Sequence, residues 1–128
     1  MNLLLDTHAL IWAANEPARL PETVRVAIED PDNHVWISAV SAIEVAIKFR
    51  IGKLEGANEL AERFEEVITG FGFKQLPISV AHASLAGLLP FEHRDPFDRI
   101  LIAQSQIEQY SLVSNEKLFD QFGVIRFW

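Results

Sequence analysis

Short apolar segments alternate with helical patterns along the whole chain, and this alternation limits the possible folds more than any other feature. Residues 2–5 form an apolar run that ends at Asp6, and similar short runs recur downstream. Uniformly apolar strands separated by helices are typical of a mainly parallel sheet. The sequence therefore predicts an α/β fold. We expect strands over residues 2–5, 35–37, 73–76, 111–114 and 124–127.

Capping residues and turns set the expected limits of the helices between these strands. Ser41 and Glu44 have the Ser-x-x-Glu spacing of a capping box, and Asp95-Pro96 is typical of a helix start. We expect helices over residues 7–14, 21–29, 41–51, 58–69, 79–88, 95–107 and 116–121, and a loop at 90–94.

Length and composition indicate one domain over residues 1–128, because 49% of the residues are hydrophobic and can form a buried core. The chain has no cysteine, which excludes disulfides, thiol catalysis and cysteine-ligated zinc. No apolar run of about 18 residues is present, so we expect no membrane segment and a cytoplasmic protein.

The net charge of −7 argues against a non-specific nucleic-acid binder, because phosphate contacts need a basic surface. It does not exclude a site where acidic residues gather around a cation, since a divalent ion inverts the local field.

Two acidic residues of the first half of the chain are candidates for such a site. Asp6 directly follows the first expected strand, where it would either cap the next helix or act in a functional crevice. Glu44 lies on a nearly all-apolar helix, where an unpaired carboxylate would be costly. It would close the capping box with Ser41, pair with Lys48 one turn on, or serve a functional site.

Further acidic and polar candidates lie in the C-terminal half of the chain. Asp95 and Asp98 fit the cap and the first turn of their helix, which explains both without any chemistry. Ser114 and Glu116 follow the fourth expected strand and have a similar capping interpretation. If all these elements share one parallel sheet, their carboxylates converge at one edge and need a cation to neutralise them. Oxygen ligands suit Mg²⁺ or Mn²⁺, which activate water and stabilise charge on a phosphodiester, so the pattern indicates a nuclease.

The basic residues Lys48, Arg50 and Lys53 form a compact group that would contact RNA phosphates or a partner, or simply line a solvated helix face. His8 lies close to Asp6 and is a further candidate for substrate contact. The histidines lack the spacing of a zinc site, and no glycine-rich phosphate loop or nucleophile elbow is present.

Four segments in order resemble the motifs of a PIN domain of the VapC type. The segments are Leu5-Asp6-Thr7-His8-Ala9-Leu10, residues 38–53, residues 93–99 followed by Ile102-Ala103-Gln104, and Leu112-Val113-Ser114-Asn115-Glu116. VapC proteins are the toxins of type II toxin–antitoxin pairs. The resemblance covers nearly the whole chain.

This resemblance implies a three-layer α/β/α fold and an Mg²⁺- or Mn²⁺-dependent endoribonuclease. By position, Asp6, Glu44 and Asp98 match the core acids, while Asp95 is an extra acid that would assist. Glu116 stands where the family often has Asp or Asn, and Ser114 stands where a hydroxyl residue would order the site. The resemblance also implies a homodimer and a VapB-like antitoxin, whose tail would place an arginine on the carboxylates.

Two other functions stay open at this point. A PIN-fold module would hold RNA or a protein without cutting, although the complete acidic set argues against it. A receiver-like phosphoryl-transfer domain would also place an acid at Asp6, but no lysine occupies a matching late strand end.

Overall fold

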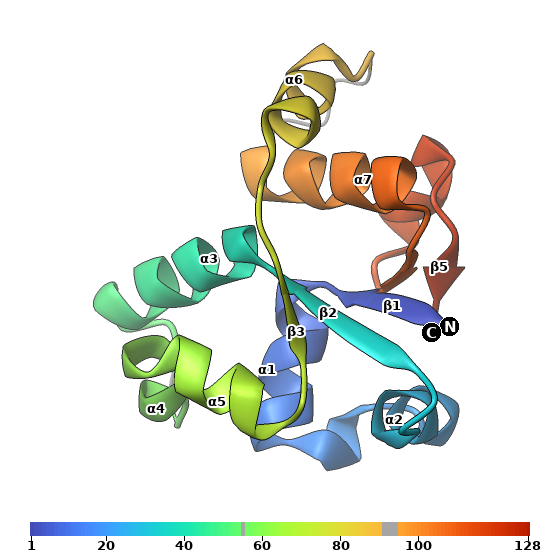
Figure 1. Ribbon diagram of the computed structural model, residues 1–128. Helices are drawn as coiled ribbons and strands as arrows, with labels where there is room; N and C mark the ends of the chain where they lie inside the picture. The colour runs from blue at the N-terminus through green and yellow to red at the C-terminus, as the bar shows by residue number, and fades with distance from the viewer. Residues whose placement is uncertain (55, 91–94) are drawn as a thin grey trace.

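A five-stranded, entirely parallel sheet forms the centre of the protein (Figure 1). The computed structural model describes residues 1–54, 56–90 and 95–128. The strand order is β3-β2-β1-β4-β5, so β1 occupies the middle and the chain crosses over between strands. The strands are β1 Asn2–Leu5, β2 His34–Ser38, β3 Lys74–Leu76, β4 Ser111–Val113 and β5 Arg126–Phe127. The predicted α/β fold with a parallel sheet is confirmed.

Helices connect successive strands and cover the sheet. The α-helices are α1 Thr7–Asn15, α2 Glu22–Glu29, α3 Ala39–Arg50, α4 Asn58–Glu62, α5 Phe64–Gly70, α6 Val80–Leu88 and α7 Pro96–Glu108. The 3₁₀ helices are η1 Pro17–Arg19 and η2 Lys117–Phe122. Within the described ranges, no helix is long and apolar enough to cross a membrane.

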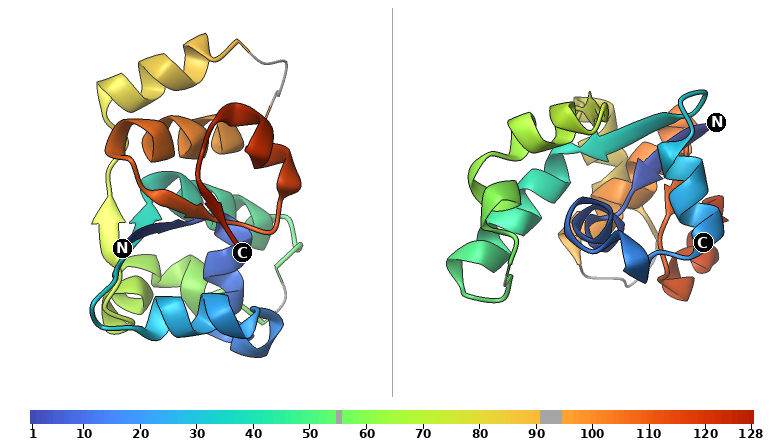
Figure 2. Two further views of the ribbon diagram at one scale, coloured as in Figure 1. Left: turned by 90° about the vertical axis from the view of Figure 1, so that its right-hand side faces the viewer. Right: turned by 90° about the horizontal axis from the view of Figure 1, so that it is seen from below.

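The sheet separates two apolar cores, which gives the three layers seen in Figures 1 and 2. Successive side chains of β1 point to opposite faces, so Leu3 and Leu5 enter one core and Leu4 enters the other. Helices α1, α2, α4 and α5 cover the first face, and α7 covers the second. All three leucines are fully buried, and they fix the end of β1 in the middle of the molecule.

Helix α6 lies outside α7, away from the sheet (Figure 1), and polar contacts attach it there. His82 is buried, and its Nε2 lies 3.0 Å from Oε1 of Glu108 on α7. Arg99 donates to the carbonyl oxygens at the C-terminal end of α6, Ala86 and Leu89, each at 2.8 Å. These bonds satisfy helix-end acceptors that would otherwise lack partners.

Three local predictions need correction. Ser38, not Ser41, caps α3, because β2 runs directly into the helix and the Ser38 hydroxyl accepts from the Val40 N–H. The single helix expected over residues 58–69 is divided into α4 and α5 by Arg63, whose backbone is not helical (φ −132°, ψ 45°). The last strand covers Arg126–Phe127 rather than residues 124–127. Residues 91–94 of the predicted loop lie outside the described residues.

Candidate metal centre

Asp6 lies at the carboxyl end of the central strand. Its N–H donates to the Val113 carbonyl on β4 across 3.0 Å, which holds it in line with the sheet. Its carboxylate accepts a hydrogen bond of 2.7 Å from the Ala9 N–H and caps α1. The predicted cap is therefore confirmed. The residue is only 5% exposed, a degree of burial that a helix cap does not require.

Ser114 follows the neighbouring strand β4 and lies beside Asp6, because Leu5 and Val113 are paired across the two strands. It is fully buried, and its hydroxyl donates to the Asp6 carboxylate. The same oxygen accepts the N–H of Glu116 at 3.0 Å. Ser114 therefore orients Asp6, while the residue Glu116 is exposed at the start of η2.

Glu44 reaches the site from α3, and both of its carboxylate oxygens have partners. The Thr7 hydroxyl donates to Oε1 across 2.6 Å, and Lys48 Nζ lies 3.1 Å from Oε2. The predicted pair with Lys48 is confirmed. The predicted capping box with Ser41 is wrong, because the buried Ser41 hydroxyl lies 3.0 Å from the Thr7 hydroxyl and belongs to the same network.

Burial raises the pKa of the Asp6 carboxyl above its ordinary value of 3.8. The hydrogen bonds from Ser114 and Ala9 and the nearby His8 lower the pKa, whereas the negative charge of Glu44 raises it further. Two carboxylates thus repel each other at a site with little solvent. This is the electrostatic condition that a bound cation relieves.

The acids of α7 begin their helix as predicted. The Asp95 carboxylate accepts from the N–H groups of Phe97 (2.9 Å) and Asp98 (3.4 Å) and is exposed. Asp98 lies in the first turn and is half-buried. The N-terminal end of α7 lies on the side of the sheet where β1 ends and α3 begins (Figure 1), and α3 and α7 contact each other.

In the described part of the chain, no three acidic or histidine side chains stand together as a preformed metal site. The centre that the structure does assemble is a pair of carboxylates, Asp6 and Glu44, with the hydroxyls of Thr7, Ser41 and Ser114 around them. All of these donors are hard oxygens, so the residues fit Mg²⁺ or Mn²⁺ better than zinc.

The basic candidates have different environments. Lys48 is half-buried in its ion pair with Glu44, whereas Arg50 at the end of α3 and Lys53 in the following segment are exposed. His8 is exposed, and its ring centroid lies 6.0 Å from that of Trp12. Arg50, Lys53 and His8 are therefore accessible to a ligand.

Thr7 has a role in the site that the sequence did not reveal. It is almost fully buried, and its hydroxyl links Glu44 with Ser41, residues more than 30 positions away in the sequence. Its place directly after Asp6 was the available signal, since the first residue of a helix at a strand end faces the same crevice.

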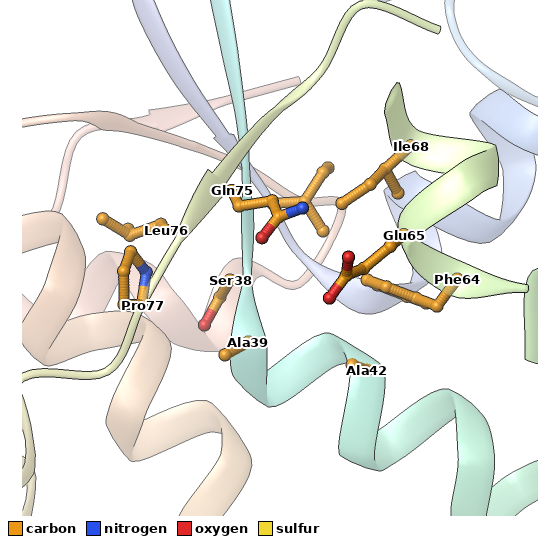
Figure 3. A pocket seen from close by; sticks show the side chains of 10 residues that line it. Ser38, Ala39, Ala42, Phe64, Glu65, Ile68, Gln75, Leu76 and Pro77 are labelled. Atoms are coloured by element: carbon orange, nitrogen blue, oxygen red, sulfur yellow. The ribbon is translucent and has the colours of Figure 1, made fainter. Parts of the chain in front are cut away.

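A separate apolar cavity of about 200 Å³ lies between α3, α5 and β3 (Figure 3). Ser38, Phe64, Ile68 and Leu76 line it, with Glu65 contributing a carboxylate. Neither Asp6 nor Glu44 lines this cavity, so it is distinct from the carboxylate pair.

The fold and the site together define a parallel α/β domain with a buried aspartate and a half-buried glutamate near the carboxyl edge of its sheet. The chain belongs to the PIN domain family, whose model matches residues 3–125. A search of curated proteins found no match.

Solved structures share this fold at low sequence identity. One is a chain of VapBC2 from Rickettsia felis bound to a DNA fragment from their promoter (TM-score 0.72, 17% identity, covering 100% of this chain and 99% of that chain). Another is a chain of FitAcB from Neisseria gonorrhoeae (TM-score 0.65, 21% identity, 98% and 96%). A chain of FitAB bound to the IR36 DNA fragment is also similar (TM-score 0.63, 22% identity, 98% and 93%).

Proposed function

We propose that this PIN domain is an Mg²⁺- or Mn²⁺-dependent endoribonuclease. The observation that carries the proposal is the buried Asp6 carboxylate beside a second carboxylate, Glu44, at the carboxyl edge of the sheet. Such a pair is unfavourable in a protein that has no use for it, because desolvation and mutual repulsion both act against it. Functional sites are where proteins retain such arrangements.

Each residue of the site has a role in this proposal. Asp6 and Glu44 would hold the ion, and Asp98 would join them from the first turn of α7. Ser114 and the Ala9 N–H keep the Asp6 carboxylate in one orientation, and Thr7 does the same for Glu44. A bound divalent ion supplies an activated water and stabilises the charge that develops on the phosphodiester. Asp95 and Glu116 are exposed and would act from the rim.

RNA phosphates would contact the exposed side chains of Arg50 and Lys53, which lie beyond Glu44 along the chain, and of His8, which lies near Asp6. With a net charge of −7, the chain has little general affinity for phosphates, so these exposed groups would provide the local attraction.

The net charge of −7 also favours binding of a basic segment of a partner protein. We propose that the protein is the toxin of a type II toxin–antitoxin pair and forms a homodimer. It would bind a VapB-like antitoxin, and an arginine of the antitoxin would form a bidentate ion pair with the carboxylates. The assemblies VapBC2 and FitAB, to which chains of this fold belong, support this part of the proposal.

An RNA cleavage assay tests the enzymatic part. The purified protein is incubated with a mixed RNA substrate in Mn²⁺, in Mg²⁺ and in excess chelator. We expect metal-dependent internal cleavage by the parent protein and a loss of at least a hundredfold in Asp6→Asn. Asp32→Asn is the matched control, because Asp32 is exposed in a turn and the substitution removes the same charge.

The rival function is a PIN module that binds RNA or protein without cutting. Binding of RNA by parent and Asp6→Asn alike, with no cleavage in either metal, would favour that module. Cleavage that survives in Asp6→Asn would instead show a different catalytic centre.

A further inference from the structure

Among the described residues, the ion pair between Lys48 and Glu44 is less exposed than the other ion pairs between residues three or four positions apart. Its side chains are only 27% and 16% exposed. In the pair of equal spacing on α2, Arg25 and Glu29, the exposed fractions are 40% and 61%, and the charged atoms lie 3.7 Å apart instead of 3.1 Å. An exposed pair contributes little because water screens it, whereas the Lys48–Glu44 pair is screened less.

The position of the Lys48 ammonium group matters as much as its burial. Glu44 cannot turn freely, because the Thr7 hydroxyl holds its other oxygen at 2.6 Å. The carboxylate that Lys48 neutralises is also the one whose charge acts on the buried Asp6. Lys48 therefore supplies a positive charge to the carboxylate pair in the metal-free protein.

A divalent ion held by Glu44 and the Lys48 ammonium group would compete for one carboxylate. Both are positive, so the entry of one raises the free energy of the other. An interaction that must break when a ligand binds reduces the ligand's affinity by its own free energy.

We propose that Lys48 is an internal placeholder for the metal ion: its ammonium group occupies Glu44 in the metal-free protein and is displaced when a divalent cation enters. This inference rests on the proposed metal-dependent function. In the metal-free protein, the Lys48 ammonium group offsets the repulsion between the two carboxylates and so stabilises the fold. The same group competes with the metal ion and makes metal binding weaker than the acids alone would allow.

Mn²⁺ binding measured by isothermal titration calorimetry, without RNA, tests the placeholder. Lys48→Met keeps the aliphatic stem and removes the charge, and we expect it to bind Mn²⁺ about three- to tenfold more tightly than the parent. Arg25→Met is the matched control, since it removes the same charge and an ion pair of the same spacing from an exposed helix face. We expect its Mn²⁺ affinity to stay within twofold of the parent.

A double-mutant cycle separates the specific contact from the general field. In a Glu44→Gln background, the gain from Lys48→Met should disappear, because the carboxylate for which the two cations compete is gone. The melting temperature of the metal-free protein is a second readout: Lys48→Met should lower it more than Arg25→Met does. Lys48→Gln replaces Lys48→Met if the latter does not fold.

The outcomes separate the two proposals. If the parent binds Mn²⁺ and Lys48→Met binds it equally or more weakly, the placeholder is wrong while the metal-dependent function stands. An equal gain in Arg25→Met, or a gain that persists with Glu44→Gln, also overturns it, since general charge then explains the effect. If the parent binds no Mn²⁺, both proposals fail.

Discussion

Thr7 donates its hydroxyl to Glu44 across 2.6 Å and thereby joins the first turn of α1 to the middle of α3. This bond connects the helices that follow the two adjacent strands β1 and β2, and it holds the second carboxylate of the site toward the first. The geometry of the carboxylate pair thus depends on a neutral residue as well as on the acids.

Replacing Thr7 tests this dependence. Thr7→Val keeps the shape of the buried side chain but leaves Glu44 without its hydroxyl donor, so we expect a loss of about 1–3 kcal/mol in the free energy of unfolding. Mn²⁺ affinity should fall as well, because Glu44 is no longer fixed. Urea denaturation and calorimetry measure the two effects. Thr23→Val on the exposed face of α2 should change stability by less than about 0.5 kcal/mol. Equal effects of the two substitutions would contradict this role of Thr7.

Asp6→Asn should stabilise the metal-free protein. The amide still accepts from the Ala9 N–H, but it removes a buried charge that Glu44 repels. We expect a gain of roughly 0.5–2 kcal/mol, as is common when a strained functional group is neutralised. The same variant should lose the stabilisation that Mn²⁺ gives the parent, which is about 2.7 kcal/mol at a hundredfold excess over Kd. Lower stability of metal-free Asp6→Asn than of the parent would argue against a strained carboxylate.

The stability gain from Asp6→Asn should depend on pH in a defined direction. Because the folded pKa of Asp6 is raised above 3.8, the folded parent takes up a proton before the unfolded chain does. The parent therefore gains stability as the pH falls from neutral through the folded pKa of Asp6 to 3.8, and the gain is complete below that value. The difference in melting temperature between Asp6→Asn and the parent, measured in chelator, should shrink over this window. A difference that widens as the pH falls would show the opposite sign of the shift.

Helix α6 should open more often when Arg99 loses its guanidinium group. Arg99→Lys keeps the charge but cannot bond to Ala86 and Leu89 in the same fork. We expect the local opening free energy of α6 to fall by roughly 1.5–3 kcal/mol. Hydrogen exchange would detect this as faster exchange in α6 with little change in β1. Arg63→Lys, which alters an exposed pair with Glu66, is the control. Unchanged protection of α6 in Arg99→Lys would show that the bonds from Arg99 do not hold the helix.

The sequence predicted the features that depend on local chemistry. The caps at Asp6 and Asp95 were predicted correctly, because a short polar side chain before an apolar helix satisfies the first N–H groups in any fold. The alternation of strands and helices likewise predicted the parallel sheet, since parallel strands need crossover connections.

Features that depend on tertiary contacts were predicted less well. Ser41 has the spacing of a cap, but its hydroxyl faces Thr7 from the interior of α3, and Ser38 takes the capping position. The link from Thr7 to Glu44 spans 37 positions. The place of Thr7 directly after Asp6 indicates that it faces the crevice, but it does not indicate this partner. The sequence left two roles open for Lys48, an ion pair with Glu44 and a contact with RNA phosphates. The structure shows the ion pair with Glu44.

The most direct test of the metal centre is a crystal of the protein soaked in Mn²⁺, with the anomalous signal of the ion recorded. We expect one strong peak about 2.1 Å from a carboxylate oxygen of Asp6, on the side that faces Glu44. The peak should be absent in Asp6→Asn. An ordered crystal at saturating Mn²⁺ with no peak beside Asp6, or with its strongest peak elsewhere, would show that Asp6 does not hold the ion.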